Sequence, residues 1–89
     1  MPLDVEVVSA EEELFSGEAN FVLARTVEGD IGILPGHAPL LAELSPYEVK
    51  VRTSSSDQSF SVEGGFMTVK DDKVIILADV GGDLAETTQ

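Results

Sequence analysis

Residues 28–44 read Glu-Gly-Asp-Ile-Gly-Ile-Leu-Pro-Gly-His-Ala-Pro-Leu-Leu-Ala-Glu-Leu, and they hold two of the four prolines, three of the eight glycines and the single histidine of the chain. Ile31 and Ile33 alternate with a glycine, which is typical of a short strand. Gly32 leaves one face of that strand bare, so that another backbone or a partner can approach closely. The stretch therefore predicts a strand that ends in a corner, with the rest of the chain as the frame that holds it.

The corner follows from the two prolines of this stretch. Pro35 has no amide hydrogen, and Pro39 restricts the residue before it to extended geometry. We therefore expect residues 35–39 to form a stiff corner outside any strand ladder, with His37 at its centre. Three leucines that follow are expected to anchor the corner on the core: Leu40, Leu41 and Leu44. A stiff, displayed loop suits a contact surface better than a moving lid.

Period-two alternation recurs along the rest of the chain and predicts an all-β fold. In residues 47–52, Tyr47, Val49 and Val51 alternate with charged residues, which indicates a strand with one buried face. We expect further strands at residues 3–7, 19–27, 59–63, 66–69 and 74–78. Their spacing predicts a flattened β-sandwich or barrel of about eight to ten short strands. It would occupy residues 1–79 as one domain, followed by a short C-terminal tail, residues 80–89.

Four breaks are expected to turn the chain between these strands. Ser16 and Gly17 would turn it after two core anchors, Leu14 and Phe15. Gly64-Gly65 is interpreted as the two-residue loop of a hairpin, because glycine accepts the positive φ angles of a primed turn. A serine-rich loop and a charged loop would supply the other two turns, at residues 53–57 and 70–73.

The composition narrows the possible partners. Seventeen acids and five bases give a formal charge of −12, which argues against nucleic acid or anionic lipid as a direct partner. A basic protein surface is favoured, although acidity that only keeps a small domain soluble remains an alternative. The N-terminus shows no targeting peptide, and no apolar run approaches the length that spans a membrane. Arg25 is interpreted as an exposed strand-end charge or a member of a local ion pair.

Residues that could support catalysis or bind a cofactor are scarce. The chain has one histidine and no cysteine, so neither a serine triad nor a zinc site is expected. No glycine-rich phosphate loop is present. Asp71 and Asp72 are interpreted as solvated turn residues, and His37 alone would be a turn residue bonded to neighbouring backbone. We expect no catalytic residue, cofactor, metal or small-molecule substrate.

Several segments carry a resemblance to a known family. The run Gly-Asp-Ile-Gly-Ile-Leu-Pro-Gly-His-Ala-Pro-Leu-Leu at residues 29–41 occurs with three others in a fixed order. These are Val-Val-Ser-Ala leading to Leu-Phe-Ser-Gly at residues 7–17, Gly-Gly-Phe at 64–66, and Val-Ile-Ile-Leu-Ala-Asp at 74–79. Over about residues 3–80 the chain resembles the epsilon subunit of F-type ATP synthases.

The resemblance implies a non-catalytic central-stalk subunit that links the gamma subunit to the c-ring of a proton- or sodium-driven ATP synthase. By analogy, Glu28, Gly29 and Asp30 would face the c-ring, and residues 37–40 (His37, Ala38, Pro39 and Leu40) would lie near gamma. The complex would sit on the cytoplasmic face of a bacterial plasma membrane, or alternatively on the stromal face of a thylakoid.

The chain also departs from the family pattern. Many epsilon subunits continue into a C-terminal helical hairpin, which restrains ATP hydrolysis and in some relatives binds ATP. We expect this chain to lack it, and therefore expect support of coupling with little inhibition; no ATP-binding residue can be carried over. Two rival interpretations remain: a β-sandwich interaction module with an unrelated partner, and a minimal hydrolase that uses His37.

Overall fold

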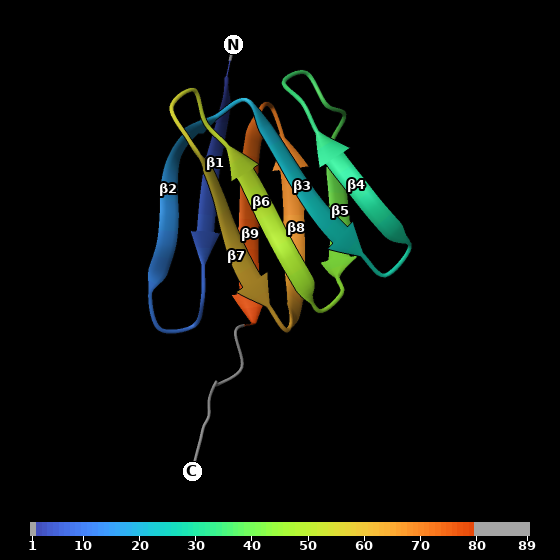
Figure 1. Cartoon of the computed structure of the whole chain (residues 1–89). Helices are drawn as coiled ribbons and strands as arrows, with labels where there is room; N and C mark the ends of the chain where they lie inside the picture. Colours follow the sequence, from blue (N-terminus) through green and yellow to red (C-terminus); the bar gives the residue numbers. More distant parts are fainter. Residues whose placement is uncertain (1, 80–89) are drawn as a thin grey trace.

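The computed structural model describes residues 2–79, and within them nine strands and no helix are found (Figure 1). Residues 80–89, predicted to form a tail, lie outside the described residues. The strands are β1 (Leu3–Val8), β2 (Glu13–Ala19), β3 (Phe21–Thr26), β4 (Gly29–Ile33), β5 (Leu40–Leu44), β6 (Tyr47–Arg52), β7 (Asp57–Val62), β8 (Gly64–Lys70) and β9 (Lys73–Asp79).

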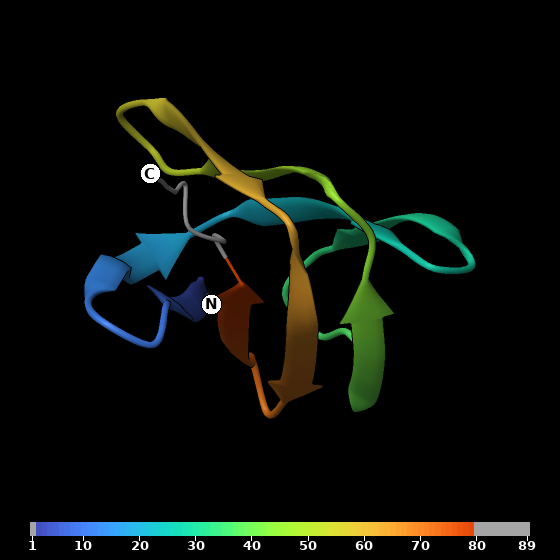
Figure 2. The same cartoon turned by 90° about the horizontal axis from the view of Figure 1, so that it is seen from below.

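The strands form two layers of one curled sheet. One layer has the order β2-β1-β9-β8-β5, and the other is formed by β4, β3, β6 and β7. Figure 2 shows the two layers facing each other. They are continuous through a single residue pair, Thr26 with Leu44, where β3 meets β5. The predicted all-β sandwich is confirmed, and the nine strands of residues 2–79 fall within the expected range.

The core lies between the layers and follows the period-two pattern. Every second residue of β1 is fully buried, and the same alternation occurs in β6 and β9. Burial of such side chains is the main source of stability in a chain of this size. The sixteen buried apolar residues are Leu3, Val5, Val7, Ala19, Val22, Ala24, Ile33, Leu44, Val49, Val51, Val62, Met67, Val69, Val74, Ile76 and Ala78.

The primed hairpin turn lies between β8 and β9, at the charged loop. Asp71 and Asp72 have φ angles of 52° and 62°, and the residues that flank them, Lys70 and Lys73, are paired. Positive φ at both central residues is the requirement of a type I′ turn, and aspartate tolerates it better than most side chains. The turn predicted at residues 70–73 is therefore confirmed.

The hairpin predicted at Gly64-Gly65 is wrong. Both glycines belong to β8, and β7 does not pair with β8 because the chain passes there from one layer to the other. Gly65 has a φ of 129°, and a Cβ atom on it would collide with the carbonyl oxygen of Leu77. The glycine is needed for a close approach of two backbones, which a sequence pattern cannot distinguish from a turn.

Three smaller expectations are also wrong. Ser16 and Gly17 do not turn the chain, because β2 continues through them in register with β1. Leu41 does not anchor the corner, since it is 70% exposed, whereas Leu44 is buried. Tyr47 is exposed too, although it precedes two buried valines of the same strand. The side chains of Leu14 and Phe15 pack against the core as expected.

Candidate interaction surface

The β3–β4 turn carries the first predicted site, Glu28 to Asp30. Thr26 holds this turn: its hydroxyl accepts a hydrogen bond from the Glu28 amide (3.1 Å) and donates one to the Gly29 carbonyl (2.8 Å). Thr26 is itself buried. The exposed tip consists of Val27 and Glu28. The turn is therefore held in shape by the buried side chain of Thr26.

Asp30 does not project as a free acid. Its carboxylate lies 2.8 Å from Nε of Arg25, and the guanidinium of Arg25 stacks 3.8 Å from the ring centre of Tyr47. The hydrogen bond to Asp30 raises the pKa of Arg25, so the contact favours the charged form of the guanidinium. The local ion pair predicted for Arg25 is confirmed. Glu28 makes no side-chain hydrogen bond or ion pair with residues 2–79, so it is the acid that this turn offers to a partner.

Of the second predicted site, residues 37–39 lie in the loop between β4 and β5, and Leu40 begins β5. Residues 34–39 belong to no strand, as the prolines predict. The His37 amide donates to the Leu34 carbonyl over 3.1 Å, and Gly36 has a φ of 89°. Proline followed by a glycine with positive φ is the pattern of a type II turn. Nδ1 of His37 donates to the Ala38 carbonyl at 2.6 Å, so the imidazole is bonded to neighbouring backbone.

The two predicted sites lie at opposite ends of β4 (Figure 1). Five residues of β4 separate the β3–β4 turn from the 34–39 loop, which corresponds to about 16 Å of extended chain. One strand thus links both sites and fixes their separation. The structure does not bring the two sets of residues together into one site.

A further surface lies beside the 34–39 loop, on the outer face of β5, β8 and β9. Leu41, Phe66 and Leu77 are 70%, 50% and 55% exposed. Phe66 of β8 is paired with Leu77 of β9. Two residues further along β8, Thr68 is paired with Leu41 of β5 on one side and with the half-buried Ile75 of β9 on the other. We call Leu41, Phe66, Ile75 and Leu77 the outer apolar face. Grouped apolar side chains on a sheet surface are typical of a partner-binding site.

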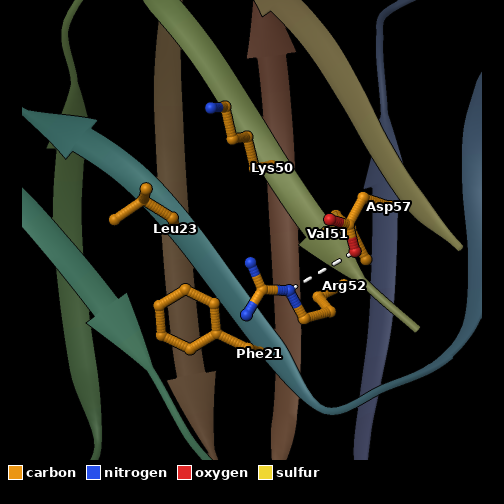
Figure 3. Close-up of a pocket in the computed structure, with 6 residues that line it drawn as sticks. All are labelled: Phe21, Leu23, Lys50, Val51, Arg52 and Asp57. Carbon is orange, nitrogen blue, oxygen red and sulfur yellow. Dashed lines mark ion pairs between the residues drawn. The ribbon is translucent and has the colours of Figure 1, made fainter. Parts of the chain in front are cut away.

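A shallow pocket lies on the outer face of the opposite layer (Figure 3). It is lined by Phe21, Leu23, Lys50, Val51, Arg52 and Asp57. Arg52 is paired with Asp57 at 3.4 Å and lies 5.7 Å from the ring centre of Phe21. The ring of Phe21 covers Gly32, which explains why that strand position is glycine. Arg52 and Asp57 of the pocket wall are thus paired with each other.

Within residues 2–79 no group of three or more histidine, cysteine or carboxylate side chains could hold a metal ion. No helix in this part of the chain is long and apolar enough to cross a membrane.

Two features of this surface were missed at the sequence level. The carboxylate of Asp72 accepts a hydrogen bond from the Gly36 amide over 2.7 Å, although the sequence indicated a solvated turn residue. The outer apolar face was missed because it needs the strand register. Apolar residues at positions that should face water, such as Leu77 in β9, were the available signal.

Comparisons with known proteins agree on one family. The family model "ATP synthase, Delta/Epsilon chain, beta-sandwich domain" matches residues 2–81. The ATP synthase epsilon chain of Frankia casuarinae is 50% identical over 80 residues, covering 89% of this chain and 94% of the relative. That of Micrococcus luteus is 51% identical over 77 residues, covering 85% of each. That of Streptomyces griseus is 47% identical, and the match covers 88% of this chain but only 64% of the relative.

Solved structures show the same fold at greater distance. A chain in the mitochondrial ATP synthase of Euglena gracilis, in a structure of OSCP, F1 and c-ring, superposes with a TM-score of 0.81. It is 24% identical, and the match covers 86% of this chain and 50% of that one. A chain from the central stalk and c-ring of the Tetrahymena thermophila enzyme gives a TM-score of 0.76 at 20% identity, covering 89% and 64%. With nearly the whole β-sandwich matched by the family model and by relatives at about half identity, the chain belongs to the ATP synthase delta/epsilon chain family.

Proposed function

We propose that this chain is a non-catalytic central-stalk subunit of an F-type ATP synthase, which helps to fix the gamma subunit to the c-ring. The observation that carries the proposal is the match to ATP synthase epsilon chains over almost the entire β-sandwich. A packed β-sandwich deforms little, which suits a subunit that transmits torque. We expect it to make and break no covalent bond itself.

The c-ring contact is assigned to the β3–β4 turn, with Glu28, Gly29 and Asp30. Its support is an exposed tip that a buried threonine fixes in place. Because Asp30 is already paired with Arg25, Glu28 is the acid that would meet a basic group of the ring. Such a rim charge contributes orientation and association rate more than affinity.

The gamma contact is assigned to His37, Ala38, Pro39 and Leu40, together with the outer apolar face. Leu40 begins β5 and packs against the core, and Leu41 begins the outer apolar face directly after it. The loop and the face therefore form one continuous surface. A partner that covered it would remove exposed apolar area from water, which is the main driving force of stable association.

The subunit would lie at a membrane without entering it. As part of an ATP synthase it would be held to the membrane through the complex. We place it on the cytoplasmic face of a bacterial plasma membrane, because the relatives with high identity are bacterial proteins.

The proposal is tested by reconstitution. Adding the chain to membrane vesicles whose ATP synthase lacks its epsilon subunit should restore ion-coupled ATP synthesis, and the chain should co-purify with gamma and the c-ring. Recovery of neither subunit would favour the rival interpretation of a binding module with an unrelated partner. The His37→Ala variant should lose no hydrolytic activity, since none is expected of the chain.

The c-ring assignment has its own prediction. Glu28→Lys should weaken association of the chain–gamma complex with the c-ring several-fold at low salt, because an attraction becomes a repulsion. Surface plasmon resonance at two salt concentrations would measure the loss, which should shrink as salt rises. Glu48→Lys is the matched control, because Glu48 is an exposed acid of β6. Equal effects of both variants would overturn the assignment of this turn.

A further inference from the structure

The 34–39 loop is held to the body of the protein by a side chain distant in sequence. Oδ1 of Asp72 accepts a hydrogen bond from the Gly36 amide over 2.7 Å, across 36 residues of sequence. Within residues 2–79, the loop otherwise makes only internal hydrogen bonds, those of the His37 amide to Leu34 and of the His37 ring to Ala38. Internal bonds set the shape of a loop, whereas a bond to another element sets its orientation.

Asp72 is itself fixed from two sides. Its φ of 62° belongs to the I′ turn between β8 and β9, and its carbonyl accepts a hydrogen bond from the Asp4 amide over 2.8 Å, at the start of β1. Its side chain is half-buried, whereas that of its neighbour Asp71 is exposed. A carboxylate whose backbone is anchored on both sides loses little further entropy when it binds.

The geometry points to Asp72 as the positioning residue of the gamma-facing loop. Its carboxylate joins the 34–39 loop to the β8–β9 turn, and so fixes the direction in which residues 37–40 are presented relative to the outer apolar face. The effect on partner binding rests on the proposed function, whereas the effect on the loop does not. Preorganisation of a loop raises affinity by removing the entropic cost of ordering it during binding.

Substitutions within the turn distinguish the contribution of the Asp72 carboxylate from that of the backbone conformation. Asp72→Gly removes the carboxylate and tolerates the positive φ, and Asp72→Asn keeps both an acceptor oxygen and a side chain that tolerates this conformation. Asp71→Gly is the matched control, because Asp71 shares the positive φ but makes no hydrogen bond to the loop. All three variants should remain folded, with similar melting temperatures.

Two measurements on these variants test the positioning role of Asp72. Hydrogen exchange by NMR should show about tenfold less protection of the Gly36 amide in Asp72→Gly, the size expected for a lost hydrogen bond to a charged group. Protection should change little in Asp72→Asn and Asp71→Gly. The affinity for a purified ATP synthase gamma subunit should fall several-fold in Asp72→Gly alone.

The outcomes are distinguishable. Unchanged Gly36 protection in Asp72→Gly would overturn the positioning role. Lost protection with unchanged gamma affinity would overturn the link between loop position and binding. A wild-type chain that failed to bind gamma would overturn the proposed function, while the exchange data would still decide whether Asp72 holds the loop.

Discussion

At the scale of single residues, Gly65 and Gly29 show two separate reasons for a glycine. Their φ angles are nearly equal, at 129° and 126°. A Cβ atom on Gly29 would meet nothing within 4 Å, whereas one on Gly65 would collide with the backbone carbonyl of Leu77 in the neighbouring strand. The first glycine is required by conformation alone, and the second by conformation together with a close approach.

This difference predicts unequal costs for the same substitution. Gly29→Ala should lower the free energy of unfolding by about 1 kcal/mol, the cost of a left-handed conformation with a side chain. Gly65→Ala should lower it by about 2 kcal/mol more, because β8 or β9 must shift. Urea denaturation of both variants would measure the two losses. Equal losses would show that β9 yields easily, contrary to its position in the middle of a layer.

At the scale of elements, the β3–β4 hairpin is stabilised by one hydroxyl group. Thr26 bonds to both Glu28 and Gly29, and its side chain is only slightly exposed. Thr26→Val keeps the volume but removes both hydrogen bonds, so it should cost about 1 kcal/mol and speed amide exchange at Glu28. Thr26→Ser, which keeps the hydroxyl, should retain the slow exchange. If serine and valine behaved alike, packing and not capping would hold the turn.

Elements whose conformation is determined by their own residues could be predicted from the sequence. The strand at residues 47–52 follows from strict alternation, and the corner at residues 35–39 follows from two prolines, so both predictions are confirmed. Gly64-Gly65 was misinterpreted because Gly65 is required by the close approach of β9, a strand distant in sequence. Ser16-Gly17 was misinterpreted because pairing with β1 keeps β2 extended through these residues. The bond of Asp72 to Gly36 depends on register in the same way, and alternation gives no register between distant strands.

At the scale of the whole molecule, the first and last strands are neighbours. β1 pairs in parallel with β9, with Asp4 opposite Lys73 and Val8 opposite Leu77. A pairing between the two ends of the described chain therefore lies in the middle of one layer. Folds dominated by such distant pairings fold in milliseconds to seconds. Both layers share one core, so the stability of each strand depends on that core.

The inner and outer faces of the β2-β1-β9-β8-β5 layer should respond differently when a leucine is replaced by alanine. Leu3 of β1 is fully buried, so Leu3→Ala should cost about 2–5 kcal/mol, a large fraction of the total stability of a small domain. Leu41 on the outer apolar face is 70% exposed, so Leu41→Ala should change the free energy of unfolding by less than about 0.5 kcal/mol. That variant should nevertheless bind gamma more weakly, because the lost apolar area is buried only in the complex. Urea denaturation and a gamma-binding titration of the two variants measure these effects. A Leu41→Ala variant with both full stability and full gamma affinity would place the gamma contact elsewhere on the sandwich.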